Sequence, residues 1–216
     1  MNILAFDTST EKFSIVIIKN NKVILKYSKT INKTYSKYLI LILKSSLEKC
    51  NLSVKNLNKI LVSLGPGSFT GIRLGIAAAK GLAMPYKIEI YGINNMDLLV
   101  NSINKNFNKK NIVTIIKSKK NDYYYQIFNF KKKLKKKISF FSLNNIPKLL
   151  FNKNNFFFGD LDKELLTEIK KRNILFYKNS KFNFFILKDL LKKKGIIKLS
   201  KTLNPIYVYE HYAKKK

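Results

Sequence analysis

The sequence has no tryptophan, one cysteine and one histidine, which narrows the chemistry that the chain can carry. The single cysteine, Cys50, excludes an intramolecular disulfide and is typical of packing on a helix-like segment. Catalytic zinc and iron sites need several nitrogen, sulfur or carboxylate ligands that converge on one point. Since the one histidine, His211, lies near the C-terminus, we expect no metal site and no cofactor.

Arginine and acidic residues are also scarce. Of 43 basic residues 41 are lysine, against 12 acidic residues, and the net charge is +31. Abundant Asn, Ile, Phe, Tyr and Lys are typical of AT-rich codons, so we interpret much of this charge as genome base composition. Residues 1–100 carry a net charge of +9 and residues 101–216 a net charge of +22. Because only two arginines are available to bind phosphates bidentately, weak and salt-sensitive attraction to RNA is favoured over specific readout.

Long apolar runs are missing as well. Residues 1–7 contain no basic region and reach an acid at Asp7, unlike a secretory signal. The apolar run at 39–43 is far shorter than the about 18 residues that a membrane helix needs. A hydrophobic content of 46% indicates a folded core. We therefore expect a cytoplasmic protein with no membrane contact and with one large or two small domains.

Five of the eight glycines fall between Gly65 and Gly81. An apolar run at 60–64 predicts a strand, after which glycine and proline force a tight turn. Ser68 or Thr70 can cap the helix that follows. Such a loop can hold an anion or let two backbones approach closely, but it lacks the lysine of a P-loop. We interpret it as a conformational element made of Gly65, Pro66, Gly67, Ser68 and Thr70.

Small residues recur every fourth position in that helix. They are Gly71, Gly75, Ala79 and Ala83. This spacing places them on one stripe, where they allow close helix packing. The pattern leaves two interpretations open, packing within the core of the protein or a docking face for a partner helix.

The remaining pattern predicts a mixed α/β fold. Strands are expected at 3–8, 13–19, 22–29, 60–64 and 88–93, and helices at 34–49 and 70–84. Residues 1–100 form the first expected domain, and a smaller lysine-rich domain covers residues 101–216.

The second half of the sequence has fewer glycines to mark the turns between its elements. A helix is expected at 98–103 and strands at 112–116, 123–130, 138–141 and 156–160. The lysine run 131–137 fits a solvated hairpin tip better than a tRNA-binding patch. The apolar segment at 204–212 is expected to pack back on the body.

Several motifs together resemble the TsaB family of bacterial tRNA threonylcarbamoyladenosine biosynthesis proteins. They are residues 3–11, the glycine loop with Ile72 and Arg73, the small-residue helix and residues 204–207. The resemblance implies the actin, Hsp70 and sugar-kinase type of fold, with two related α/β domains and mixed sheets. It also implies a role in placing a threonylcarbamoyl group on the adenosine beside the anticodon of certain tRNAs. The protein would pair with a catalytic paralogue, TsaD, and the ATPase TsaE would join them.

The residues bear on which of these proteins does the chemistry. The catalytic relative carries a His-x-x-x-His motif after the fifth strand, whereas residues 92–98 here contain no histidine. Asp7, Thr8 and Ser9 stand where kinases of this fold hold phosphates. Residues 101–216 contain only Gly159 and Gly195 and no Gly-Gly pair for an adenosine. We therefore interpret residues 7–9 as a vestigial phosphate loop.

The resulting hypothesis is a non-catalytic scaffold without cofactor or metal. Helices 34–49 and 70–84 would form a bundle with the equivalent helices of the paralogue, or with a second copy of this chain, while tRNA would bind only through the complex. The expected interface residues are Tyr38, Leu39, Ile42, Gly71, Gly75, Ala79 and Ala83. Two alternatives are a stand-alone RNA-binding protein and an ATP-dependent phosphotransferase.

Overall fold

The computed structural model describes residues 1–30, 35–103, 109–119, 121–178 and 198–208. The described residues form two compact units. Residues 1–95 and 198–206 make up the first unit, and residues 96–178 and 207–208 the second. The chain passes from one to the other between Asn95 and Met96.

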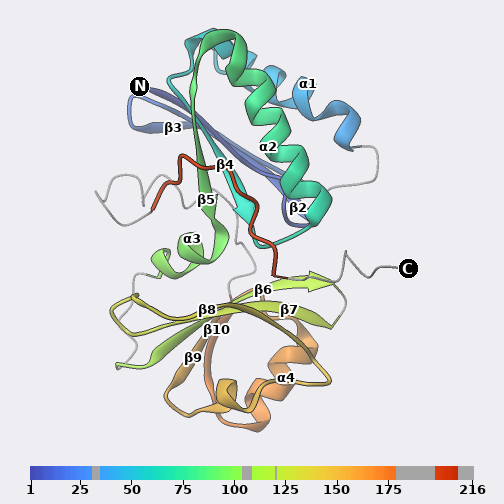
Figure 1. Cartoon of the computed structure of the whole chain (residues 1–216), viewed down its shortest axis with the longest axis vertical. Helices are drawn as coiled ribbons and strands as arrows, with labels where there is room; N and C mark the ends of the chain where they lie inside the picture. The colour runs from blue at the N-terminus through green and yellow to red at the C-terminus, as the bar shows by residue number, and fades with distance from the viewer. Residues whose placement is uncertain (31–34, 104–108, 120, 179–197, 209–216) are drawn as a thin grey trace. The chain divides into compact units, whose positions relative to one another are not determined.

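The first unit is built on a mixed five-stranded sheet with the order β3-β2-β1-β4-β5 (Figure 1). Its strands are β1 (Asn2–Asp7), β2 (Lys12–Lys19), β3 (Lys22–Thr30), β4 (Lys59–Gly65) and β5 (Glu89–Asn94). Strands β1, β4 and β5 run parallel, and β2 is antiparallel to both β1 and β3. Asn20 and Asn21 make the turn between β2 and β3 with φ of 49° and 62°, as a tight hairpin requires.

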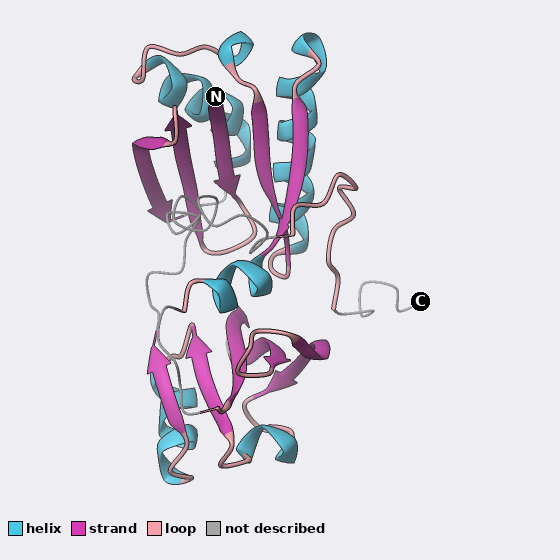
Figure 2. Cartoon of the chain, turned by 90° about the vertical axis from the view of Figure 1, so that its left-hand side faces the viewer, coloured by secondary structure: helices cyan, strands magenta, loops and turns pink. Residues whose placement is uncertain are grey.

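Two helices, α1 (Tyr35–Glu48) and α2 (Phe69–Ala83), pack on the same face of this sheet, as Figure 2 shows in cyan behind the strands. Short 3-10 turns lie at Val54–Asn56 (η1) and Met84–Tyr86 (η2). One core cluster joins alternate residues of β1 and β2, such as Phe6 and Ile15, to Leu43 of α1 and Ile76 of α2. The period of two in the strands and of about 3.6 in the helices produces this shared interior.

Residues 198–206 return to the first unit and extend its edge. Ser200 and Gly92 exchange two backbone hydrogen bonds of 2.8 and 3.0 Å. The amide of Ile206 donates to the carbonyl of Leu64 at 2.8 Å. Leu203 and Ile206 pack against the core cluster, so part of the segment that was expected to pack back on the body, 204–206, contacts the first unit.

The second unit repeats the same sheet plan. Its strands are β6 (Asn111–Lys119), β7 (Asp122–Phe128), β8 (Leu134–Ser142), β9 (Asn155–Gly159) and β10 (Leu175–Lys178). They lie in the order β10-β9-β6-β7-β8. The unit's first strand is central, its next two follow as antiparallel neighbours, and its last two are parallel on the other side. Two mixed sheets, as expected from the resemblance, are confirmed.

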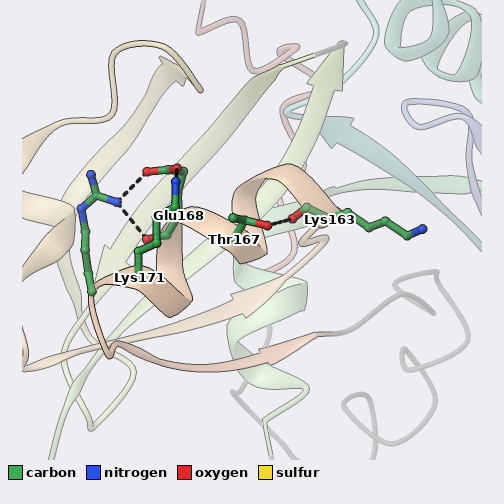
Figure 3. Close-up of polar contacts among 5 residues, drawn as sticks. Lys163, Thr167, Glu168 and Lys171 are labelled. Carbon is green, nitrogen blue, oxygen red and sulfur yellow. Dashed lines mark hydrogen bonds and ion pairs between the residues drawn. The ribbon is translucent and has the colours of Figure 1, made fainter.

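Helix α4 (Lys163–Lys171) covers one face of the second sheet through Leu165 and Ile169. Residues of helix α3 (Asn95–Asn101), such as Leu99, belong to a separate core cluster with Phe156 and Phe158. A 3-10 turn, η3, spans Lys148–Phe151. On the outer side of α4, Glu168 forms ion pairs with Lys171 at 2.9 Å and Arg172 at 2.6 Å (Figure 3).

Most expected strands and helices are present, with three differences. Helix α4 and strand β10 were not predicted, and β8 begins at Leu134, which is inside the run interpreted as a hairpin tip. The turn is shorter because the side chain of Asn129 organises it by accepting from the amides of Lys131 and Lys133. In the described part of the chain, no helix is long and apolar enough to cross a membrane.

Candidate functional site

A buried polar cluster lies where strands β1 and β4 end. Asp7 is the last residue of β1, and β4 ends in the glycine loop that leads to α2. Because the carboxyl ends of parallel strands meet at one edge of a sheet, the two loops are neighbours. Asp7, Thr8 and Ser9 are all buried, although each is polar.

Hydrogen bonds connect this cluster internally. Oδ1 of Asp7 accepts from the amide of Ser9 at 2.8 Å and from its hydroxyl at 2.6 Å. The side-chain amide of Asn95 donates to Oγ of Ser9 at 2.8 Å and to the carbonyl of Pro66 at 3.3 Å. The hydroxyl of Ser63 donates to Oδ1 of Asn95 at 2.9 Å. Asn95 thereby ties the end of β1 to the glycine loop, a role that no sequence motif indicates.

Burial raises the pKa of the Asp7 carboxyl, and the hydrogen bonds from Ser9 offset only part of that rise. Within the described residues Oδ2 of Asp7 has no hydrogen-bond partner. Removing a carboxylate from water disfavours its charged form unless donors surround both oxygens. The protonated form of Asp7 is therefore stabilised by the fold, and its Oδ1 holds the backbone of Ser9 in place.

The glycine loop packs directly on residues 8 and 9. The amide of Ser68 donates to the carbonyl of Ser9 at 2.7 Å, and the hydroxyl of Thr8 donates to the carbonyl of Gly71 at 2.6 Å. A Cβ atom at Gly67 would overlap the Ser9 carbonyl, and one at Gly71 would overlap that of Thr8. These glycines permit close approach of two backbones.

The amides of Gly65 and Gly71, like that of Ser68, already have partners inside the protein. The amide of Gly65 donates to Oγ of Ser63 at 3.0 Å, and that of Gly71 to Oγ of Ser68 at 3.2 Å. Ser68 is thus the N-cap of α2, one of the two caps expected, while Thr70 is exposed in the first turn. Gly65 has φ of 92° and is followed by a cis peptide bond to Pro66. The geometry serves loop packing more directly than phosphate binding.

The small-residue stripe of α2 faces inward, which corrects the expectation of a docking face at these positions. A Cβ atom at Gly75 would overlap Oγ1 of Thr8 and lie 3.3 Å from Val62. Ala79 and Ala83 are buried in the core cluster. The stripe brings α2 close to the end of β1, so packing within the core is the interpretation that fits.

The outward surface of the two helices has a different composition. On α1, Tyr38 and Leu41 are 53% and 62% exposed, Ile42 is half-buried, and Leu39 is buried against the sheet. On α2 the exposed side carries a second stripe at the same spacing. It consists of Arg73, Ala77 and Gly81. A Cβ atom at Gly81 would meet no atom within 4 Å, so the stripe is open at this residue.

Sequence reasoning missed Ala77 and Gly81. The spacing of four that singled out Gly75 also relates residues 73, 77 and 81, so one helix carries two stripes. Periodicity finds both but does not say which one faces the core.

The second unit contains its own polar cluster, on the face that carries α4. The hydroxyl of Tyr123 donates to the carboxylate of Asp162 at 2.6 Å, and Nζ of Lys117 lies 2.9 Å from Oδ2 of Asp162. Oδ1 of Asp162 also accepts from the amide of Leu165 and caps α4. Burial raises the pKa of Asp162, but these hydrogen bonds and the charge of Lys117 together lower it by more, so the pKa lies below its ordinary value.

Across the residues that the structure describes, no three side chains of His, Cys, Asp or Glu gather where they could hold a metal ion. His211 lies outside the described residues. Cys50 is partly buried and packs against the first core cluster.

Sequence comparisons identify relatives. The family model described as "TsaD: tRNA N6-adenosine threonylcarbamoyltransferase" matches residues 26–150. The tRNA threonylcarbamoyladenosine biosynthesis protein TsaB of Bacillus subtilis (strain 168) is 28% identical over 206 residues, which cover 95% of this chain and 83% of the relative. TsaB of Buchnera aphidicola subsp. Schizaphis graminum (strain Sg) is 33% identical over 123 residues, 57% of this chain. That match spans little more than half of the relative, 58% of its length.

Solved structures agree on the fold. YeaZ from Pseudomonas aeruginosa superposes with a TM-score of 0.67 at 16% identity, covering 95% of this chain and 99% of that one. A Bacteroides thetaiotaomicron VPI-5482 protein with an actin-like ATPase fold and unknown function superposes with a TM-score of 0.51 at 13% identity, over 89% and 96% of the two chains. The actin-like fold expected from the sequence is confirmed. Taken with the family model, these matches show that the chain belongs to the TsaB/YeaZ family, which is related to TsaD.

Proposed function

We propose that this chain is a non-catalytic subunit in the formation of threonylcarbamoyladenosine in tRNA. It pairs with a TsaD-like catalytic paralogue, and a TsaE-like ATPase joins the pair. The names of its relatives supply the pathway. The observation that carries the scaffold role is the open outer surface of α1 and α2, with Leu41 exposed on one helix and Ala77 and Gly81 on the other.

This surface suits a helix-to-helix interface. Small residues at Ala77 and Gly81 let a partner helix approach closely, and the apolar Tyr38 and Leu41 lose their contact with water on pairing. A stable pair of this kind buries on the order of 1,600 Å². The partner gains order from the contact, so the chain acts by stabilising a competent state of the enzyme.

The end of β1 supports a role other than phosphoryl transfer. Oδ1 of Asp7 accepts two hydrogen bonds from Ser9, and burial disfavours the ionised carboxylate. Phosphoryl-transfer sites need charged groups and free amides aimed at the phosphates. Here the amides of Gly65, Ser68 and Gly71 donate to protein oxygens.

The test is to mix the chain with the TsaD-like paralogue of the same genome and measure mass by light scattering on a sizing column. We expect a one-to-one complex. Leu41→Glu and Ala77→Arg should each weaken pairing at least about tenfold, since a charge is then desolvated at the contact. Ile24→Glu, which changes an exposed apolar residue on β3, is the matched control and should pair normally.

Circular dichroism of each variant separates lost pairing from lost folding. Pairing of Leu41→Glu and Ala77→Arg at wild-type strength would overturn the proposed interface. A homodimer of the chain alone that the same two substitutions dissociate would place self-association on the same surface. Turnover of ATP by the isolated chain that Asp7→Asn abolishes would overturn the non-catalytic assignment.

A further inference from the structure

The second unit carries a concentrated positive charge along one edge of its sheet. Between Asp122 and Asp160 the sequence has eight lysines and no acidic residue. Four of these lysines are exposed on the β7–β8 turn and on β8, the edge strand. They are Lys131, Lys133, Lys135 and Lys137, and we refer to them as the basic edge.

Nothing among the described residues neutralises this charge. The ion pairs of the second unit lie elsewhere, at Asp162 and at Glu168. Nζ of Lys135 donates to Oδ1 of Asn111, a neutral group, at 3.3 Å. Nζ of Lys131 lies 5.7 Å from the centre of the Phe130 ring, which is itself 42% exposed. The edge therefore presents unpaired cations beside an accessible aromatic ring.

Side-chain hydrogen bonds organise the turn that carries the first two lysines. Oδ1 of Asn129 accepts from the amides of Lys131 and Lys133 at 2.9 and 3.0 Å. Lys132 adopts φ of 60°, and its Nζ donates to the carbonyl of Ile103 at 2.6 Å. Lys132 is thus used to fix the turn, and its two neighbours remain exposed on a pre-formed support.

Along β8 the remaining lysines differ in their exposure. Nζ of Lys136 lies 5.6 Å from the centre of the Tyr125 ring and is half-buried, whereas Lys135 and Lys137 are exposed. Lys135 and Lys137 are roughly 6.6 Å apart along the strand. Register shifts at Tyr125/Ile127 and Ile127/Phe128 bend this edge. The result is a row of cations spaced along an extended backbone.

In place of the solvated hairpin tip that the sequence favours, and because β8 begins within the lysine run, we propose that the basic edge binds the phosphate backbone of RNA. That the RNA is tRNA rests on the proposed function. Lysine is a point charge that contacts phosphates without reading sequence, so the edge positions the nucleic acid and does not select it. Phe130 offers a face on which an unpaired base can stack. A row of cations on a strand matches a linear polyanion better than it matches a compact acidic protein.

A protective role is the competing explanation, because lysines on an edge strand also prevent sheets from joining. The first unit supplies a matched comparison, since its own edge strand β3 carries the exposed Lys22, Lys26 and Lys29. A purely protective function predicts the same RNA affinity after neutralising either edge. The proposal predicts that neutralising the basic edge weakens RNA binding more than neutralising the lysines of β3 does.

The experiment measures binding of a tRNA transcript to the chain alone and to its complex with the paralogue, by fluorescence anisotropy across a salt series. The test variant is K131Q/K133Q/K135Q/K137Q. The control is K12Q/K22Q/K26Q/K29Q, with the same loss of charge, in which the exposed Lys12 of β2 pairs with the end of β3. We expect the test variant to bind at least about tenfold more weakly and the control less than about twofold. The slope of log K against log salt should fall by about 3, because each phosphate contact contributes about 0.7 to 0.9.

Replacing the same four lysines by arginine should restore binding. Equal weakening in both glutamine variants would reduce the effect to bulk charge and overturn the proposal, as would unchanged binding in both. Stronger retention on phosphatidylserine vesicles than on tRNA would assign the edge to membranes instead. Aggregation of the test variant with normal RNA binding by its soluble fraction would leave only the protective role.

Light scattering of the same variants mixed with the paralogue measures pairing independently of RNA binding. It therefore tests the scaffold role separately from the basic edge. Pairing without an effect of the basic edge on RNA binding overturns the edge alone. Loss of the expected pairing with an intact effect on RNA binding overturns the scaffold role alone.

Discussion

Thr8 is the residue against which helix α2 is fitted. Its carbonyl lies where a Cβ of Gly71 would stand, and its hydroxyl where a Cβ of Gly75 would stand. Its hydroxyl also donates to the carbonyl of Gly71. Two glycines inside a helix cost about 1 kcal/mol each relative to alanine. The close packing on Thr8 offsets this cost and explains why they are present.

Gly75→Ala should destabilise the chain by about 1–3 kcal/mol, since an added methyl group has no space beside Thr8 and overpacking exceeds the gain in helix propensity. Gly81→Ala, in the same helix but with open space at its Cβ, should stabilise by about 0.5–1 kcal/mol. Urea unfolding of both variants measures the difference. Equal effects at the two glycines would contradict the packing described here.

Asp7 should make the stability of the chain fall as pH rises above the ordinary carboxyl pKa of 3.8. Burial raises the pKa of Asp7 in the folded state, so the unfolded chain loses its proton first, and each rise in pH then favours unfolding until the folded pKa is passed. Asp7→Asn keeps an oxygen to accept from Ser9 but cannot ionise. Its stability relative to wild type should therefore increase between pH 3.8 and neutrality in urea titrations. Parallel curves would show that Asp7 does not titrate as described.

At the scale of elements, helix α4 is anchored to its sheet through one carboxylate. Asp162 caps the helix, accepts from Tyr123 on β7 and pairs with Lys117 on β6. Burial raises the pKa of the Tyr123 hydroxyl, and the neighbouring Asp162 raises it further, so tyrosine stays the donor. One side chain thereby joins three secondary-structure elements.

Tyr123→Phe should cost about 1.5–3 kcal/mol at pH 7, the range for a hydrogen bond to a charged group. The folded pKa of Asp162 is lowered, so its contribution is present above its ordinary pKa and is lost as pH falls. The difference in unfolding free energy between Tyr123→Phe and wild type should therefore become smaller as the pH is lowered. Tyr124→Phe is the control, because its hydroxyl makes no hydrogen bond within the described residues and it lies in another cluster. Urea unfolding at pH 7 and pH 3 tests both variants.

How far the sequence predicts these elements depends on their surroundings. The strands of the first unit and helices α1 and α2 were predictable, because broad apolar runs end at Asn20-Asn21, the glycine loop and Pro85. Helix α4 and strand β10 were missed, since lysines and glutamates mask a narrow apolar stripe of Leu165 and Ile169. The inward direction of Gly75 and the role of Asn95 depend on partners distant in sequence, which local pattern does not encode.

At the scale of the whole molecule, the two units share one plan of strands. Each has its first strand at the centre, a hairpin on one side and two parallel strands on the other. Only the first unit carries the glycine loop, and only the second carries a dense cluster of lysines, six of them within residues 131–137. The shared topology with different edges is what would allow one chain to divide pairing and RNA contact between its halves.

Residues 198–206 complete the first unit only late in synthesis, because they follow the second unit's sheet in the sequence. During synthesis, the core of this unit emerges early but lacks its last contacts, Ser200 on Gly92 and Ile206 on Leu64. At translation rates of about 5–20 residues per second, the stretch between Asn95 and Ser200 delays that closure by roughly 5–20 s. The second unit's sheet is synthesised in that interval. The first unit is thus completed only after the sheet of the second unit has been synthesised, and a ribosome-bound chain presents an unsealed edge beside β5 until residues 198–206 have emerged.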